Sequence, residues 1–286
     1  MSVRRLITTA DDFGLSLGVN EAVARAATEG ILTSASLMVA GPFAADAVAR
    51  ARRMPDLRVG LHLVVIEGAA ILPRAEIPDL VDDFGTFPSA QLRLGVNYFF
   101  RPQVRRQLAA EIRAQFAAFA ATGLVLDHAN AHKHMHLHPT VGRLMIEIGR
   151  EYGLRAIRVP AEPALPGGPA QTLGSRALRR WCAVLRRQAR RAGMLTNDHI
   201  LGLGWTGQMN VERIRAVLAH LPEGLTELYL HPATHKDSTL HRLMPRYAHA
   251  AELHTLLATV LPPDIQLTSY SVEHARAQAQ DIRRVV

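Results

Sequence analysis

The sequence contains a single cysteine, few aromatic residues and no long uninterrupted apolar run. Because Cys182 is the only thiol, an intrachain disulfide and a zinc cluster built from thiolates are both excluded. Aromatic residues make up 5% of the chain, which argues against a surface on which nucleic-acid bases stack. The lack of a long apolar run means that no transmembrane helix is expected.

A secretory signal is also missing, because Met1–Arg5 lead directly into a short strand-like run. We therefore expect a cytoplasmic protein. Arginine, by contrast, is abundant, and the net charge is +8. A basic chain can bind nucleic acid, an anionic membrane or an anionic substrate. The sequence has no zinc finger, RNA-binding aromatic motif or glycine-rich phosphate loop, so we expect no nucleic-acid partner.

Strand-like apolar runs alternate with helical patterns along the 286 residues. This alternation predicts a parallel sheet with right-handed crossovers. The number of units favours an α/β fold of the distorted or incomplete β/α (TIM-like) barrel type, with residues 1–286 in a single domain. An open doubly wound sheet is the competing fold. Strands are predicted near 4–10, 33–40, 57–65, 124–129, 154–159, 198–203, 225–231 and 265–270, and helices near 18–30, 43–53, 102–122, 139–152, 175–192, 210–220 and 247–260.

Two segments suggest additional roles. Residues 66–101 contain prolines, glycines and several aromatic residues, and they follow the strand that contains His62. We expect a loop that covers the site, or alternatively a small satellite cluster of apolar side chains. The helix predicted near 175–192 carries seven arginines on one side, between Arg176 and Arg191. It is either an ordinary barrel helix with a solvated face or a surface helix that contacts anionic lipid.

Polar groups that bind metals follow four of the predicted strands. They are Asp11, Asp12, His62, the histidine-rich run 128–138, and His231. Parallel strands of a barrel point the same way, so their carboxyl ends meet on the face where barrel enzymes build their active sites. Carboxylates and imidazoles brought together there bind divalent cations. The pattern indicates a metal-dependent enzyme.

Each group also has a simpler explanation when taken alone. The two aspartates could cap the following helix, and His62 and His231 could be buried core histidines. Asp-Asp-Phe-Gly recurs at 82–85, where we assign it to turns because no strand precedes it. The run 128–138 holds five histidines, too many for one catalytic metal site. The roles of His128, His134, His136 and His138 therefore stay open.

Taken together, these motifs resemble those of the YdjC-like carbohydrate deacetylases. The resemblance extends from about residue 4 to residue 271. The sequence of residues 130–134 is most similar to that of the hopanoid biosynthesis-associated (HpnK) branch. It implies a distorted barrel and hydrolysis of the N-acetyl group of an amino sugar. The motifs that carry it are Asp11–Gly14, Gly60–His62, His132 to His136, and His231–Pro232.

The resemblance also assigns metal ligands. Asp12, His62 and His132 match the family's ligands for one divalent metal ion, for which zinc, magnesium, manganese, cobalt and nickel are all compatible. Many members carry Asp-Ser just before the third ligand, where this chain has Asn130 and Ala131. That departure changes the charge around the metal position.

The same resemblance assigns three catalytic roles. Asp11 matches the general base, His231 matches the catalytic acid, and Arg158 matches an arginine at a strand end that would help to stabilise an oxyanion. The implied substrate is an N-acetylated amino sugar or glycolipid, such as the N-acetylglucosaminyl head group of a hopanoid. The enzyme would then touch the inner face of an anionic membrane peripherally, and it could form a homodimer. The alternatives are a metal-dependent hydrolase or isomerase of another small substrate and a non-catalytic protein that binds a membrane or acidic partner.

Overall fold

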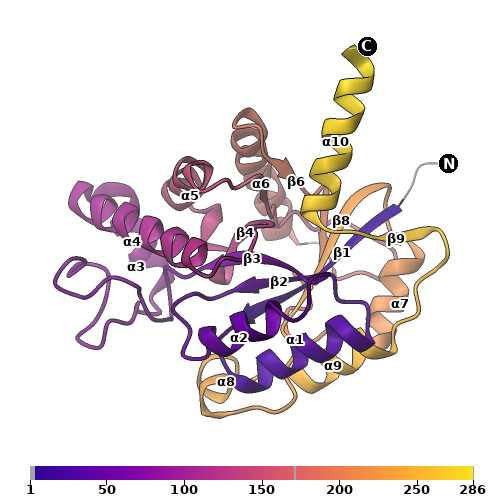
Figure 1. Ribbon diagram of the computed structural model, residues 1–286, viewed down its shortest axis with the longest axis horizontal. Coiled ribbons are helices and arrows are strands. Elements are labelled where there is room, and N and C mark those ends of the chain that lie inside the picture. The colour runs from indigo at the N-terminus through magenta and orange to yellow at the C-terminus, as the bar shows by residue number, and fades with distance from the viewer. Residues whose placement is uncertain (1–3, 171, 286) are drawn as a thin grey trace.

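The computed structural model describes residues 4–170 and 172–285, which form one curled parallel sheet surrounded by helices (Figure 1). The sheet has nine strands in the order β6-β5-β4-β3-β2-β1-β8-β7, with β9 paired to β1. The strands are β1 (Arg4–Phe13), β2 (Ser34–Leu37), β3 (Arg58–Leu63), β4 (Ala129–Ala131), β5 (Ala156–Ile157), β6 (Leu195–Thr196), β7 (His199–Leu201), β8 (Gly224–Leu230) and β9 (Ile265–Leu267).

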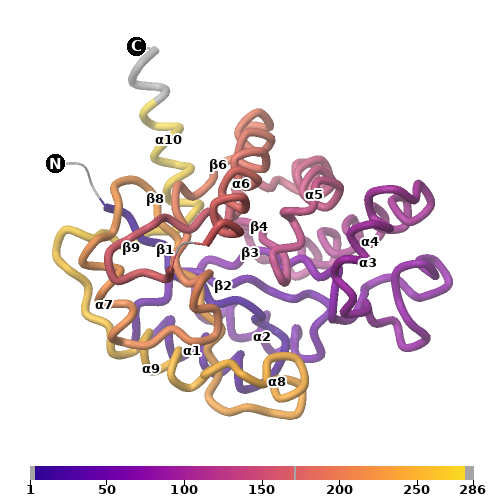
Figure 2. The backbone as a smooth tube through the Cα atoms, turned by 180° about the vertical axis from the view of Figure 1, so that it is seen from behind, coloured from indigo at the N-terminus to yellow at the C-terminus, as the bar shows by residue number. Residues whose placement is uncertain are grey.

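The helices cover the outside of the sheet in two runs (Figures 1 and 2). In one run α3, α4, α5 and α6 pack side by side, and in the other α2, α1, α9 and α7 do so. Their bounds are α1 (Leu17–Glu29), α2 (Ala44–Ala51), α3 (Gln91–Phe100), α4 (Pro102–Ala121), α5 (Pro139–Glu151), α6 (Leu173–Arg191), α7 (Val211–Ala219), α8 (Ser238–Leu243), α9 (His249–Ala258) and α10 (Tyr270–Val285), and a 3-10 helix η1 covers His132–Leu137.

Local sequence signals explain how several elements begin. Ser16 caps α1, because its side chain accepts a hydrogen bond from the backbone N–H of Val19. Pro139 occupies the first turn of α5, where a missing N–H costs nothing. The central strand β1 is buried from Leu6 to Phe13, as expected for a parallel strand covered on both faces.

The sheet curls until its two edges meet at Asn197. The edge strands β6 and β7 are separated by only two residues of chain, and each pairs with a different neighbour. The buried side chain of Asn197 bridges this corner: its oxygen accepts from Val159 N (2.7 Å), and its amide donates to Val159 O (2.9 Å) and His199 O (2.8 Å). The strands therefore form a distorted, incompletely paired barrel, which confirms the predicted fold class.

Several predicted boundaries differ from the structure. The strand predicted at 124–129 begins only at Ala129, although the backbone of Asp127 and His128 already forms hydrogen bonds with β3. Residues 66–101 are not irregular throughout, since α3 occupies their end, and β6, α8 and α10 were not predicted. In the ranges that the structure describes, no helix is both long enough and apolar enough to cross a membrane.

Candidate metal centre

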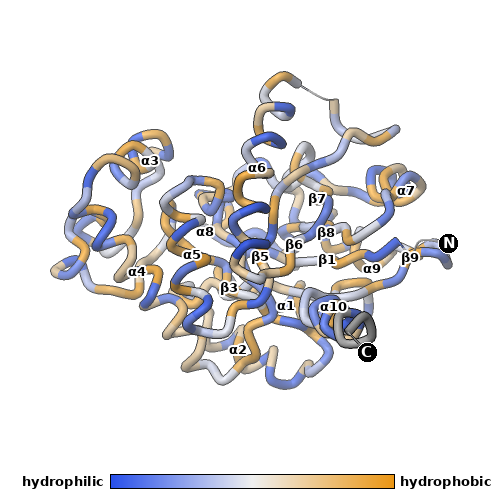
Figure 3. The backbone as a smooth tube through the Cα atoms, turned by 90° about the horizontal axis from the view of Figure 1, so that it is seen from above, coloured by the Kyte–Doolittle hydropathy of each residue, from blue (hydrophilic) through white to orange (hydrophobic). Residues whose placement is uncertain are grey.

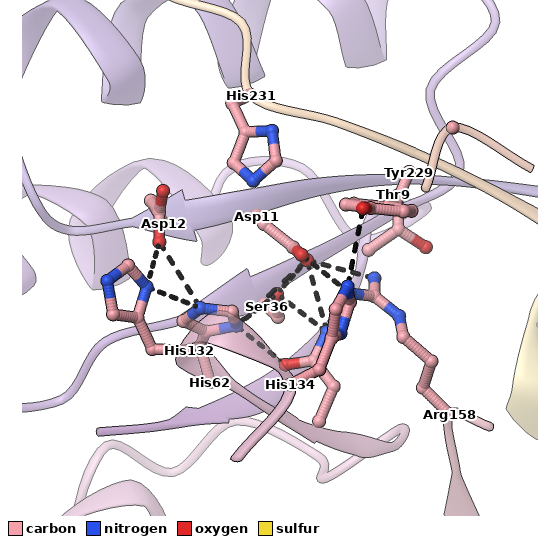
Figure 4. A network of polar contacts seen from close by, with 12 residues as sticks. Thr9, Asp11, Asp12, Ser36, His62, His132, His134, Arg158, Tyr229 and His231 are labelled. Atoms are coloured by element: carbon pink, nitrogen blue, oxygen red, sulfur yellow. Dashed lines mark hydrogen bonds and ion pairs between the residues drawn. The ribbon is translucent and has the colours of Figure 1, made fainter. Parts of the chain in front are cut away.

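Three of the predicted residues meet at the carboxyl ends of β1, β3 and β4. Asp12 Oδ1 lies 3.2 Å from His62 Nε2 and 3.2 Å from His132 Nδ1, and the two imidazole nitrogens are 3.4 Å apart (Figure 4). All three side chains are buried. The strand ends thus bring one carboxylate and two imidazoles together although 120 residues separate Asp12 from His132.

The cluster fits a divalent cation. Ligands held about 2.0–2.1 Å from a tetrahedral ion lie about 3.4 Å from one another, close to the separations found here. The second carboxylate oxygen of Asp12, Oδ2, is buried without a hydrogen-bond partner among the described residues. Asp12 also adopts a φ of 64°, a strained conformation that favours glycine and that commonly marks a functional site. Asp12, His62 and His132 could therefore hold a metal ion.

Asn130 and Ser36 orient the imidazole of His62. The Asn130 side-chain oxygen is 2.6 Å from His62 Nδ1, and the Ser36 hydroxyl is 3.2 Å from the same nitrogen. An amide oxygen can only accept, so Nδ1 carries the proton and the lone pair of Nε2 faces Asp12 and His132. Asn130 thus fixes the tautomer of His62 that a metal ligand needs.

Asp11 points to the other side of the strand end and pairs with Arg158. The guanidinium donates to Asp11 Oδ2 from Nη1 (2.5 Å) and to Oδ1 from Nη2 (2.9 Å). Ser36 (2.6 Å) and Asn130 (3.1 Å) donate to the same Oδ1. Burial alone would raise the pKa of Asp11, but the charge and hydrogen bonds of Arg158 outweigh it and hold that pKa far below its usual range. Asp11 is therefore a fixed carboxylate.

Arg158 is fully buried because a second carboxylate compensates its charge. Glu227 on β8 accepts from Arg158 Nη2 (2.8 Å), Thr9 Oγ1 (2.7 Å) and the hydroxyl of Tyr270 (2.6 Å). Burial opposes the ionisation of Glu227, but the Arg158 charge prevails and lowers the pKa of the carboxyl. Arg158 thus sits between two carboxylates beneath the site, a position that explains how a guanidinium can be buried.

His231 follows β8 and lies on the far side of Asp11 and Asp12 from the sheet, with its ring directed toward them (Figure 4). Its ring centre is 5.5 Å from that of Tyr229 and 5.0 Å from that of Tyr247. Burial lowers the pKa of His231 to about 4, even though the nearby aspartates raise it. The imidazole is therefore neutral at pH 7.

Asp11, His62, His132 and His231 line one pocket with a volume of about 320 Å³. Its lining is rich in ring side chains and comes from six different segments. Residues 66–101 contribute nothing to it, although Glu67 forms an ion pair with the pocket residue Lys133. The lining residues are Asp11, His62, Ala131, His132, Lys133, His134, Thr206, Tyr229, His231, Leu243, Met244 and Tyr247.

The model of the YdjC-like protein family matches residues 5–266 of this chain. The chain belongs to the YdjC-like family. The family-level resemblance that the motifs indicated is thereby confirmed, with the site residues inside the matched region.

Sequence comparison finds YdjC-like relatives among bacterial carbohydrate deacetylases. The chain is 26% identical to one from Thermoanaerobacter pseudethanolicus over 94% of this chain and 99% of the relative. It is 38% identical to one from Brevibacillus brevis over 52% of this chain and 56% of that relative. The chain therefore spans only about half the length of some relatives that it matches more strongly.

Structural comparison gives the same YdjC-like fold. A crystal structure from Enterococcus faecalis, of a protein named for cellobiose-phosphate cleavage, superimposes with a TM-score of 0.74. The superposition covers 94% of this chain and 98% of the other, at 24% sequence identity. At that identity the comparison supports the fold alone.

The structure divides the five clustered histidines of this YdjC-like chain into three groups. His132 and His134 line the pocket. His128 and His136 are buried and do not line it: His128 Nδ1 is 2.9 Å from Asp127, and His136 Nε2 is 3.0 Å from Arg158 O. His138 precedes α5, outside the pocket.

Sequence reasoning missed several residues of the site. Glu227, Ser36, Tyr229 and Tyr247 had no motif to mark them, and only the fold brings them to the metal centre. Backbone conformation also marks the site, in a way that the sequence does not show. Among the described non-glycine residues, those with positive φ all lie at or beside the site: Asp12, Glu67, Lys133 and His134.

Proposed function

We propose that this YdjC-like protein is a metal-dependent hydrolase that removes the N-acetyl group from an N-acetylated amino sugar. The observation that carries the proposal is the buried group of Asp12, His62 and His132, of which the two histidines line one pocket together with Asp11 and His231. The names of its YdjC-like relatives support a carbohydrate substrate. Hydrolysis would release acetate and leave a free amine on the sugar.

In this proposal Asp12, His62 and His132 hold one divalent ion, for which zinc, magnesium, manganese, cobalt and nickel remain candidates. When bound, the ion would supply Lewis acidity to the acetamide carbonyl and lower the pKa of water at the site. The protein contributes the orientation, because Asn130 holds the His62 ring in the required tautomer.

Asp11 and His231 each carry out one of the two proton transfers of the proposed hydrolysis. Asp11 is ionised and accepts the proton of the attacking water, and His231 delivers a proton to the leaving amine. Since His231 is neutral at pH 7, it must gain a proton before it can deliver one, and the proton that Asp11 takes from the attacking water is the source that the reaction supplies. Arg158 does not line the pocket, so we assign it to positioning Asp11 rather than to the oxyanion.

Acetate release tests this function directly. We expect the purified protein to release acetate from at least one member of a panel of N-acetylated sugars. Chelation should abolish the release, and addition of a single divalent metal should restore it. Metal-dependent turnover without acetate would favour a hydrolase or isomerase of another class, and binding without any turnover would favour a non-catalytic protein.

For the substrate we propose a glycolipid, the N-acetylglucosaminyl head group of a hopanoid, as the resemblance to the HpnK branch implies. An apolar groove of about 490 Å³ beside the pocket supports this proposal. The groove and the pocket share Lys133 and His134, so an aglycone attached to a sugar in the pocket would reach it. The groove is lined by Gln91, Gly95, Lys133, His134, Met135, Leu137, His138, Pro139, Leu178 and Trp181.

Exposed apolar side chains flank this groove on α3 and α6, which lie along the same side of the molecule (Figure 3). Phe99 on α3 is 47% exposed, with its ring centre 6.3 Å from that of the groove residue His138, and Trp181 on α6 is 48% exposed. The buried residues of α6 are Cys182, Leu185 and Ala189. Trp181 and its neighbours are thus available to an apolar ligand or a lipid surface.

We further propose that the arginines of α6 bring the protein to an anionic membrane. Arg186 does not belong to the solvated face, since it is half-buried and donates to the carbonyl of Asp198 (2.8 Å). Replacing the exposed Arg180, Arg187 and Arg191 by Gln should weaken binding to anionic vesicles by up to about a hundredfold, at about 1 kcal/mol per charge. Vesicle co-sedimentation measures this, and high salt should mimic the substitutions.

The matched control replaces three exposed arginines in the other run of helices, Arg25 on α1, Arg53 just after α2 and Arg215 on α7, with Gln. It removes the same charge and leaves α6 unchanged, so vesicle binding should stay close to that of the wild type. Hydrolysis of a soluble N-acetylated sugar should be unchanged in both variants. Equal vesicle binding by all three proteins would leave α6 as an ordinary barrel helix.

A further inference from the structure

Tyr247 lies in the catalytic pocket with an uncommitted hydroxyl. Its ring meets His231 edge to face, with 5.0 Å between the ring centres. Among the residues that the structure describes, none forms a hydrogen bond with the Tyr247 hydroxyl. The pocket's other tyrosine, Tyr229, differs in this respect, because its hydroxyl is 2.7 Å from Thr206 Oγ1 and 3.3 Å from His134 Nε2. The Tyr247 hydroxyl therefore remains available to a ligand in the pocket.

Gly207 leaves the space that the Tyr247 ring occupies. Gly207 has a φ of +71°, and a Cβ atom there would lie only 2.2 Å from the Tyr247 ring. The backbone N–H of Ala248 donates to Gly207 O (2.7 Å), which ties the two segments together. The N–H of Tyr247 donates to Met244 O (3.2 Å), closing a turn after α8. The hydrogen bond to Gly207 and the turn after α8 thus hold the Tyr247 ring against His231.

The chemistry of the Tyr247 hydroxyl is that of a neutral donor. Burial raises its pKa, and the negative charges of Asp12, Glu252, Asp11 and Glu67 raise it further. Asp11 and Tyr247 line the same pocket. A phenol held there donates a hydrogen bond and does not ionise, which suits it to a hydroxyl oxygen of a sugar.

We propose that Tyr247 is a specificity-determining residue that contacts the substrate. Its ring forms one wall of the binding site for the amino sugar, and its hydroxyl donates a hydrogen bond to a sugar hydroxyl next to the acetamido group whose nitrogen His231 protonates. This inference rests on the proposed function, because it takes an amino sugar as the ligand of the pocket. It assigns Tyr247 to substrate binding and leaves the chemical step to Asp11 and His231.

Steady-state kinetics of Tyr247→Phe test the assignment. Loss of one neutral hydrogen bond should raise KM for the N-acetylated sugar about fivefold, with kcat within about twofold of the wild type. Tyr152→Phe, a half-buried tyrosine outside the pocket, should change neither constant. A fall in kcat with unchanged KM would overturn the proposal, since the hydroxyl would then act in the transition state.

Gly207→Ala provides a second test that leaves the tyrosine in place. Its matched control is Gly123→Ala, because Gly123 has the same φ of +71° but nothing within 4 Å of an added Cβ. Both variants carry a similar backbone penalty, which thermal melting measures. Only Gly207→Ala should also raise KM, because only there does the new methyl group displace the Tyr247 ring. Equal KM values in the two variants would contradict the proposal.

Binding of the deacetylated product, glucosamine, separates this inference from the proposed function. Calorimetry with glucosamine should give an affinity about fivefold weaker for Tyr247→Phe than for the wild type. If the wild type releases no acetate but binds glucosamine with this difference, the proposed reaction fails and the contact stands. If acetate is released and the two affinities are equal, the contact fails and the reaction stands. Absence of both turnover and binding overturns both.

Discussion

Replacing His132 by Ala is expected to remove the bound divalent ion and nearly all turnover. His132 Nδ1 lies 3.2 Å from Asp12 Oδ1, and without it only Asp12 and His62 remain as ligands. A metal ion contributes several kcal/mol of transition-state stabilisation, so turnover should fall by about a thousandfold or more. Elemental analysis should show about one ion per chain in the wild type and close to none in the variant.

His138→Ala is the matched control for this experiment. His138 belongs to the same histidine-rich run but lies outside the pocket, so the variant should retain its metal. Thermal melting in the presence of a chelator establishes whether the apo forms of both variants are folded. An unchanged metal content in His132→Ala would contradict the ligand assignment, whatever happens to turnover.

Replacing Asp11 by Asn should leave the metal in place and reduce turnover by about 10²–10⁴-fold, the usual contribution of a general base. Asn retains the size of the side chain but cannot accept a proton, and it loses the charge that Arg158 holds. Metal analysis and acetate release on the same preparation measure both effects. The second Asp-Asp-Phe-Gly motif supplies the control, because Asp82→Asn changes the equivalent residue in a loop where Asp82 accepts from Thr86 N (2.9 Å).

Two outcomes would contradict this assignment in different ways. Loss of the metal in Asp11→Asn would make Asp11 a ligand, and the roles of Asp11 and Asp12 would have to be exchanged. Retained turnover in Asp11→Asn, with none in His231→Ala, would identify His231 as the proton acceptor. The second outcome has a physical basis, because every oxygen of Asp11 already accepts hydrogen bonds whereas His231 is a neutral imidazole.

Much of the site could be predicted because it follows from the direction of the strands. Asp12, His62 and His132 lie at the ends of strand-like runs, and parallel strands bring such ends to one face. The alternation of strands and helices similarly indicated a barrel. Element boundaries were less certain: β4 begins at Ala129 rather than at residue 124, and the first backbone hydrogen bond to β3 comes from Asp127.

The sequence by itself therefore determined the barrel class, the family and the strand-end residues, since these depend on local periodicity and short motifs. Only the tertiary structure decided which of the clustered histidines face the pocket, because η1 turns through positive φ at Lys133 and His134. It alone also brought Glu227 beneath Arg158 and Tyr247 beside His231. Such contacts join residues far apart in the chain, and no local pattern encodes them, because they depend on how the sheet curls and where each loop returns.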